Sequence, residues 1–345
     1  MQYKLDETYC LEEFKKLLAI DSTTSCCQAV QDFVQKEVEA MGYPVQVTHK
    51  GGLIADLGGK GNTLVVTAHL DDIGLMVRSI KSNGTLMVCE IGGLRPYVAE
   101  RESVRIYTRD GRMYTGEIQR DISSIHVSTD DAWTQQSDYR KNIGVIIDAP
   151  VSNPQEVRAL GIEVGDIIAL EPRFSYANRY IKSRFIDDKA CVAILLAGMK
   201  MMKEKHIAPK RHVLAYFAVY EEIGHGTTWL PDGVEDLLAV DIACCGPEQT
   251  SDERKVSIFA KDSRFPYHYE MTNELIATAK AEGLDYAIDV LTPHYGTDGD
   301  ATILAGYDVR HAAIGPGTQG SHGFERTNMT GLANVYALMM AYLLK

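Results

Sequence analysis

The chain has 345 residues, of which 45% are apolar and 24% are charged, and its formal net charge is −12. This length is enough for one large α/β domain and a second, smaller one. An acidic chain without a visible basic patch lacks the positive surface that phosphate backbones require, so nucleic acid is excluded as an expected partner.

Membrane insertion and secretion are not expected either. No stretch approaches the roughly 20 apolar residues of a membrane span, and the first residues, MQYKLDETYC, lack the layout of a secretory signal. The seven cysteines include the adjacent pairs Cys26-Cys27 and Cys244-Cys245, which is not the pattern of a disulfide framework, and no CxxC occurs. We therefore expect a reducing, cytoplasmic location and no cysteine-based zinc knuckle.

The N-terminal part of the chain predicts two amphipathic helices followed by a hairpin. Apolar residues recur at helical spacing in 10–19 and in 28–41. Strands are expected at 45–48 and 53–57, joined through Lys50-Gly51-Gly52. A longer apolar strand then ends at His69.

From about residue 75 to residue 173 the pattern changes to short alternating strands. The segment 103–119 is typical of a hairpin with Asp110-Gly111 at its turn, and further strands are expected at 144–147 and 166–170. We interpret residues 75–173 as a small β domain inserted into an α/β domain formed by residues 1–74 and 174–345. The alternative is a set of excursions within one domain.

Helices and strands alternate again after residue 186. The predicted helices are 187–205, 273–281, 298–304 and 331–344. The predicted strands are 212–220, 236–244, 287–291 and 309–314.

Three apolar runs end in residues that could bind a metal: His69 with Asp71, Glu221 with Glu222, and Asp241. Near-continuous apolar runs are typical of central strands in a parallel sheet that is buried on both faces. Ligands of such sheets gather at the carboxyl ends of the strands. Because a buried carboxylate is costly unless it is paired or bound to a metal, the pattern predicts a metal site at this edge.

Two further residues are candidates for the same site. Asp187 opens the helix after the β domain, and its two carboxylate oxygens could bridge two cations; alternatively, Asp187 and Asp188 only cap the helix and complement its dipole. His322 lies in a glycine-rich loop, where the alternative is a surface histidine. His225 and His294 are weaker candidates for residues that face the substrate.

The residue types also indicate roles. A metal-bound imidazole usually donates its other N–H to a carboxylate, a task for which Asp71 is positioned behind His69. Of two adjacent carboxylates such as Glu221 and Glu222, one can bind metal while the other takes a proton from metal-bound water. Taken singly, a core His–Asp pair and a solvated acidic loop remain the alternatives.

The full order of motifs, H-x-D, D-D, E-E, D and H, resembles a known family. With the insertion, the segment GIEVGDIIALEP and Gly296-Thr297-Asp298, the chain is similar to the cocatalytic dinuclear metallo-aminopeptidases that include glutamyl, deblocking and tetrahedral (TET) aminopeptidases. The resemblance implies a phosphorylase/hydrolase-like zinc-peptidase fold. In this α/β fold a mixed, mainly parallel sheet is sandwiched by helices and carries an inserted small β-barrel or PDZ-like domain.

The resemblance also implies two divalent metal ions per subunit, zinc or cobalt, with manganese as a further option. His69 and Asp241 resemble the ligands of one ion, and Glu222 and His322 those of the other. Asp187 matches the bridging carboxylate, Glu221 the general base and Asp71 the acid behind His69.

The implied activity is removal of N-terminal residues from peptides, and the implied partner is a second copy of the chain, bound through the inserted domain in assemblies that are often dodecamers. Three segments depart from the family pattern: Lys189-Ala190-Cys191, the position of His225, and Gly323–Glu325. We expect them to border the substrate cleft, so the preferred N-terminal residue stays open.

Three alternative functions remain open. A related dinuclear carboxypeptidase or N-acyl amino-acid deacylase usually carries its extra domain after the E-E motif and needs a basic anchor; here the insertion precedes Asp187, which favours the aminopeptidase. A glycosidase with paired carboxylates would work without metal. A binding protein with a decayed site is a third, non-enzymatic alternative.

Overall fold

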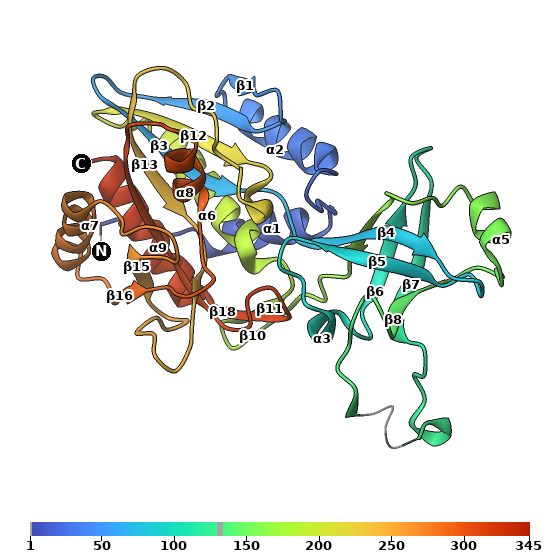
Figure 1. Ribbon diagram of the computed structural model, residues 1–345. Coiled ribbons are helices and arrows are strands. Elements are labelled where there is room, and N and C mark those ends of the chain that lie inside the picture. The colour runs from blue at the N-terminus through green and yellow to red at the C-terminus, as the bar shows by residue number, and fades with distance from the viewer. Residues whose placement is uncertain (1, 130–133) are drawn as a thin grey trace. The chain divides into compact units, whose positions relative to one another are not determined.

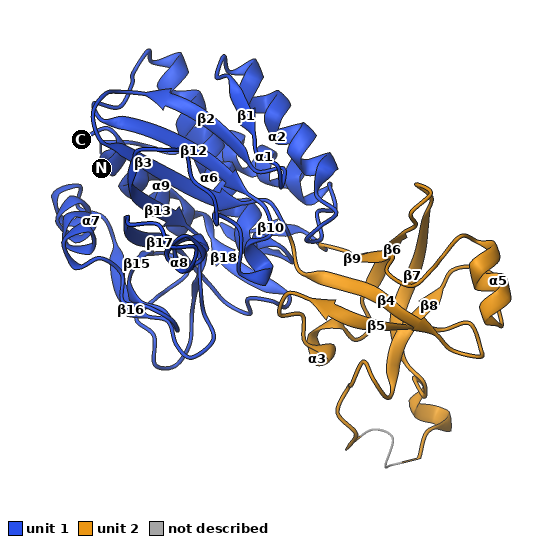
Figure 2. Ribbon diagram, turned by 45° about the horizontal axis from the view of Figure 1, so that its top comes forward, with its two compact units in different colours: residues 1–71, 173–345 blue, residues 72–172 orange. Residues whose placement is uncertain are grey.

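The computed structural model describes residues 2–129 and 134–345. The chain forms two compact units, one of residues 1–71 with 173–345 and one of residues 72–172 (Figure 2). We call them unit 1 and unit 2. The second unit is thus an insertion into the first, between the strand that ends at His69 and the helix that begins at Ile186.

Unit 1 is built on a mixed, mainly parallel sheet (Figure 1). Its strands, in spatial order, are β1 (Val45–Val47), β2 (Leu53–Gly58), β12 (His212–Ala218), β3 (Thr63–His69), β13 (Val234–Val240), β17 (Arg310–Thr318), β15 (Val256–Lys261) and β16 (Tyr286–Val290). The two-residue β14 (Ala243–Cys244) pairs with the end of β17. Strands β12, β3, β13 and β17 are neighbours and run parallel, whereas β2 and β15 join this group in the antiparallel sense.

Helices sandwich the sheet of unit 1. They are α1 (Glu7–Leu18), α2 (Gln28–Ala40), α6 (Ile186–Glu204), α7 (Tyr269–Ala281), α8 (Asp298–Leu304) and α9 (Met329–Leu343). Helix α6 packs on β3, α9 on β15 and β17, and α8 on β13, β17 and β3. Every residue of β3 is buried, as expected of a strand covered on both faces. The predicted fold class is therefore confirmed.

The length and apolar character of these helices also bear on membrane insertion. Within residues 2–129 and 134–345, no helix combines the length and the apolar character needed to cross a bilayer.

Several strands of unit 1 were not expected from the sequence. These are β15 and the small sheet of β10 (Ser175–Ala177), β11 (Tyr180–Ser183) and β18 (Glu325–Asn328). Strand β17 also continues beyond the predicted end at 314, through Gly315-Pro316-Gly317, which is a typical turn signal. A Cβ atom at Gly315 would lie 1.4 Å from the backbone oxygen of Asp241. The glycine therefore serves close strand packing beside Asp241, where sequence rules predict a turn.

Unit 2 is a closed antiparallel barrel. Its strands, in order around the barrel, are β4 (Gly74–Ile80), β5 (Leu86–Ile91), β8 (Ile143–Ile147), β7 (Met113–Arg120), β6 (Ser103–Tyr107) and β9 (Ile167–Leu170). Short helices α3 (Pro96–Ala99) and α5 (Pro154–Ala159) and the 3-10 turn η1 (Ile125–Val127) lie in its connections. Alternate residues such as Leu75, Val77 and Val88 are fully buried inside, so the barrel has a core of its own.

Candidate metal centre

The topology of unit 1 brings the predicted ligands to one edge of the sheet. The parallel strands β12, β3, β13 and β17 end side by side, and their carboxyl ends carry the polar residues. His69 is the last residue of β3, Asp241 follows β13, and His322 follows β17. The adjacent glutamates lie in the 3-10 turn η2 (Glu221–Ile223) just after β12.

Among the described residues, two groups of side chains could each hold a metal ion, and both groups include Asp187. Within each group, the possible ligand atoms lie within 4.8 Å of one another. The first is His69, Asp187 and Asp241, and the second is Asp187, Glu222 and His322. Oδ1 of Asp187 lies 3.2 Å from Nε2 of His69, and Oδ2 lies 3.8 Å from Nε2 of His322. The Asp187 carboxylate thus faces the two groups with different oxygens, which is the arrangement that bridging requires.

Glu221 lies beside the first group without belonging to either. Its Oε2 is 3.7 Å from Nε2 of His69, and its side chain is 13% exposed. Glu222, by contrast, contacts the second group, with Oε2 3.3 Å from Nε2 of His322. The two adjacent glutamates therefore offer their carboxylates to one site, because the tight turn η2 replaces the alternation of a strand.

Burial and mutual repulsion perturb these acids strongly. Burial, together with the neighbouring acids, raises the pKa of Asp241, Glu221 and Glu222. Burial alone would lower the pKa of His322, but Glu222 and Asp187 outweigh it and raise that pKa to about 10. This concentration of buried negative charge is the environment that divalent cations neutralise.

The donor set fits divalent metal ions of the borderline class. Each group combines one imidazole nitrogen with two carboxylates, a mixture that suits zinc, cobalt or manganese. Asp187 and His69 are held in place by neighbours: Ser321 Oγ donates to Asp187 Oδ2 at 3.2 Å, and the His69 backbone N–H donates to Asp188 at 3.1 Å. The residues therefore fit a centre of two ions with Asp187 between them.

Asp71 lies behind His69, but its contacts differ from the expectation. Nδ1 of His69 lies 2.9 Å from the backbone oxygen of Asp71 and 3.7 Å from Oδ1. The carboxylate instead accepts hydrogen bonds from the backbone N–H groups of Glu221 (3.1 Å) and Glu222 (3.3 Å) and from the Thr24 hydroxyl (2.7 Å). Fully buried Asp71 therefore fixes the turn that carries both glutamates.

Glu325 is a buried residue of this centre that the sequence analysis named only within a segment that departs from the family pattern, without a role in holding the ligands. Its Oε2 accepts from the backbone N–H groups of Ile186 (2.6 Å) and Asp187 (3.2 Å), and its Oε1 accepts from that of His322 (3.3 Å). One carboxylate therefore ties together two loops that each supply a ligand. No spacing rule could have found this role, because Glu325 lies 138 positions after Asp187.

The remaining candidates lie in different environments. The His225 ring stacks on Tyr220, with centroids 5.0 Å apart, and His294 is exposed. Lys189 and Cys191 are buried within α6, where Lys189 donates to the backbone oxygen of Ile20 at 2.9 Å. The expectation that this segment borders a substrate cleft does not match its burial.

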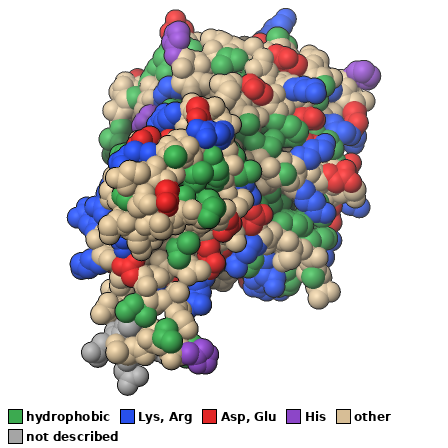
Figure 3. All heavy atoms as spheres, turned by 90° about the vertical axis from the view of Figure 1, so that its right-hand side faces the viewer, with side chains coloured by type: hydrophobic (Ala, Val, Ile, Leu, Met, Phe, Trp, Pro, Cys, Tyr) green, Lys and Arg blue, Asp and Glu red, His purple; other side chains and the backbone are tan. Residues whose placement is uncertain are grey.

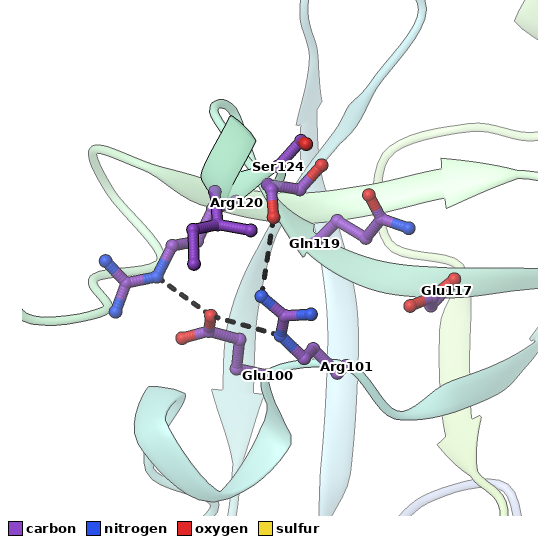
Figure 4. A pocket seen from close by; sticks show the side chains of 8 residues that line it. Glu100, Arg101, Glu117, Gln119, Arg120 and Ser124 are labelled. Atoms are coloured by element: carbon purple, nitrogen blue, oxygen red, sulfur yellow. Dashed lines mark hydrogen bonds and ion pairs between the residues drawn. The ribbon is translucent and has the colours of Figure 1, made fainter. Parts of the chain in front are cut away.

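Unit 2 has a pocket of its own, of about 320 Å³, shown in Figure 4. Its arginines are engaged within the protein: Arg120 donates to Glu100 at 2.8 Å, and Arg101 donates to the backbone oxygen of Ser123 at 3.4 Å. The lining residues include no histidine. This pocket therefore lacks the mixed donor set of unit 1.

Comparison with known proteins agrees with the fold and identifies the family. The sequence model described as M42 glutamyl aminopeptidase matches residues 51–338. "Putative aminopeptidase YhfE" of Bacillus subtilis is 36% identical over 336 residues, which cover 96% of each chain.

Solved structures of similar fold cover nearly the whole chain. The aminopeptidase APDkam598 of the archaeon Desulfurococcus kamchatkensis superimposes with a TM-score of 0.86 at 23% identity, covering 98% of this chain and 95% of its own. The TET1 peptidase of Pyrococcus horikoshii, described as assembling into a tetrahedron or a large octahedral shell, gives a TM-score of 0.84 at 22% identity, covering 97% and 99%.

The fold and the family match together define a hydrolase that acts on peptides. The chain belongs to the M42 glutamyl aminopeptidase family.

Proposed function

We propose that this protein is a metal-dependent aminopeptidase that removes N-terminal residues, that two bound cations would activate the attacking water, and that Glu221 is the general base. The observation that carries the proposal is the pair of ligand groups that share Asp187, with the Glu221 carboxylate 3.7 Å from His69. His69 and Asp241 would hold one ion, Glu222 and His322 the other, and Asp187 both.

The bound ions supply Lewis acidity, polarising the scissile carbonyl and lowering the pKa of water from about 15.7 to roughly 7. Glu221 takes the proton of the attacking water and passes it to the leaving amine. Burial raises the pKa of Glu221, the direction that favours proton uptake near neutral pH. Asp71 holds the N–H groups of Glu221 and Glu222, so that the base keeps its orientation. The acidic site also attracts the cationic α-amine of a free N-terminus.

Chelation provides the first test of this proposal. Removing divalent metal should abolish hydrolysis of chromogenic aminoacyl substrates, and adding back zinc, cobalt or manganese should restore it. The same panel should show loss of activity on N-acetylated versions, because an aminopeptidase needs the free amine.

Other outcomes of the panel would favour the rivals. Cleavage of the N-acetylated substrates, or of C-terminal residues, would indicate the related deacylase or carboxypeptidase. Sugar hydrolysis that survives chelation would indicate the glycosidase, and stoichiometric metal binding without any hydrolysis would indicate a binding protein.

We propose in addition that unit 2 mediates self-association. The connection between β7 and β8 exposes apolar side chains, with exposed fractions of 51% at Ile122, 56% at Ile125 and 82% at Val127. Figure 3, in which the right-hand side of Figure 1 faces the viewer, shows hydrophobic side chains on that surface. Exposed apolar groups of this kind mark interaction sites. The TET1 peptidase of Pyrococcus horikoshii can assemble into a tetrahedron or a large octahedral shell, and the similar solved structure of PhTET1-12s holds a dodecamer in its asymmetric unit. We propose a dodecamer for this chain as well.

The double variant Ile125→Asp and Val127→Asp should dissociate the assembly. Carboxylates buried at an apolar interface would lose their hydration without gaining a partner. Light scattering should then report the mass of a smaller species. The matched control is Leu304→Asp in unit 1, a residue that is 59% exposed and should leave the mass unchanged. A double variant that keeps the wild-type mass would place the interface elsewhere.

The cysteines support a proposal about location. The seven cysteines include the adjacent pairs Cys26-Cys27 and Cys244-Cys245, which is not the pattern of a disulfide framework. Disulfide frameworks are typical of oxidising compartments. We therefore propose a cytoplasmic location for this protein.

A further inference from the structure

We propose that Lys50 is a positioning residue for the general base: its ammonium group holds residues 225–228, and this segment in turn holds the turn that carries Glu221. The inference rests on the proposed function, since it assigns Glu221 the role of base. Lys50 lies in the hairpin connection between β1 and β2, far from the E-E motif in the sequence.

The half-buried ammonium group of Lys50 is saturated by one short segment. It donates to the backbone oxygens of His225 and Gly226, the latter at 3.0 Å, and to the Thr228 hydroxyl at 2.8 Å. An ammonium group has three donors, and three oxygens of residues 225–228 accept from it. Lys50 therefore clamps the chain immediately after η2.

The clamped segment packs directly on the base. A Cβ atom at Gly226 would lie 3.3 Å from Cα of Glu221 and 2.0 Å from Oδ1 of Asp298, so no side chain fits between them. The backbone N–H of Gly224 donates to the Glu221 oxygen at 2.7 Å, and that of Thr227 donates to Asp298 at 3.0 Å. A shift of residues 225–228 would thus move the backbone of Glu221.

The turn η2 depends on such support from both sides. Tyr220, which precedes it, has a φ of +69°, in the left-handed region that is unfavourable for a residue with a side chain. Asp71 holds the N–H groups of η2 on one side. On the other side His225, whose backbone oxygen accepts from Lys50, stacks its ring on Tyr220.

Charge adds to these hydrogen bonds. Burial lowers the pKa of Lys50, and the carboxylates of Asp298 and Asp71 oppose that change by attracting its positive charge. Both carboxylates bind backbone N–H groups of the same loop. Loss of the Lys50 ammonium group would leave two backbone oxygens without their donor and the carboxylates of Asp298 and Asp71 without a nearby positive charge. We therefore expect residues 225–228 to move from their present position.

The test is a comparison of Lys50→Met, Lys50→Arg and the control Lys60→Met, an exposed lysine after β2. A small displacement of a catalytic group can cost about 100-fold in rate, so we expect kcat of Lys50→Met to fall about 10- to 100-fold with KM little changed. Metal content should remain at the wild-type value. Lys50→Arg should recover part of kcat, and Lys60→Met should match wild type.

A double-mutant cycle with Glu221→Gln separates positioning from a structural role. If Lys50 acts through Glu221, then Lys50→Met should cause no further loss of kcat in the Glu221→Gln background. Additive losses would overturn the inference, as would a wild-type kcat for Lys50→Met. Failure of the base assignment would look different, because Glu221→Gln alone would then keep near-normal turnover.

Thr228→Val provides a second variant of nearly the same shape, in case Lys50→Met does not fold. It removes one acceptor of the Lys50 ammonium group, together with the hydrogen bond that the Thr228 hydroxyl donates to the backbone oxygen of His225 at 3.2 Å, within the same segment. We expect kcat to fall several-fold while the thermal midpoint and the metal content stay unchanged. In the Glu221→Gln background, Thr228→Val should cause no further loss of kcat. A fall in thermal midpoint with unchanged kcat in the folded protein would contradict the inference.

Discussion

Glu221→Gln should reduce turnover by about 10²–10⁴ while both metal ions stay bound, because the amide keeps the shape of the side chain but cannot accept a proton. The structure supports this separation, since Glu221 belongs to neither ligand group although its carboxylate lies 3.7 Å from His69. The measurement is kcat on an aminoacyl substrate together with metal analysis of the same sample.

The matched control is Glu235→Gln, an exposed residue at the start of β13, which should leave kcat and metal content unchanged. Near-normal turnover of Glu221→Gln would refute the role of base. Loss of one metal ion in that variant would instead make Glu221 a ligand and leave the base to be found elsewhere.

Asp187→Asn should have the second large effect, through the metal ions themselves. An amide is neutral and has a single oxygen, so it cannot serve two cations at once. The substitution also removes one negative charge from the site, so the remaining acids, Asp241 and Glu222, attract the two cations less strongly. We expect fewer than two ions per subunit and a fall in turnover on the order of 10³ or more, since metal ions contribute several kcal/mol to the transition state.

Metal analysis after dialysis, with Asp308→Asn as an exposed control, measures this effect. Tight binding of two ions by Asp187→Asn would show that Asp187 does not bridge. A full complement of metal with normal turnover would remove Asp187 from the mechanism altogether.

The fold could be predicted where the hydrophobic pattern of a segment was consistent with only one type of secondary structure. The continuous apolar runs that lead into His69, Glu221 and Asp241 predicted parallel strands, and β3, β12 and β13 are such strands. The order of motifs also indicated the peptidase family, which the comparisons confirm. Alternation and turn residues, which are local signals, predicted a small β domain, and the family resemblance implied a barrel, which the structure shows.

What could not be predicted depends on contacts between distant segments. Strand β15 is short and apolar, and only its pairing with β17 and β16 distinguishes it from a piece of helix. The end of β17 contains glycine and proline, which local rules assign to a turn, whereas close packing against Asp241 requires the glycine.

The same limit applies to the candidate site. The seven proposed site residues could be named because each follows a strand or opens a helix. The residues that hold them, such as Glu325 and Lys50, bond to backbone groups more than 100 positions away. Asp71 was predicted beside His69, but its bonds to the N–H groups of Glu221 and Glu222 depend on how β3 and β12 end in space.

The central claim is that two cations lie on either side of Asp187, and anomalous diffraction from crystals grown with zinc tests it most directly. The account predicts two peaks in each subunit, one against His69 and Asp241 and one against Glu222 and His322, with the Asp187 carboxylate between them. A single peak, or peaks that do not contact Asp187, would contradict the account.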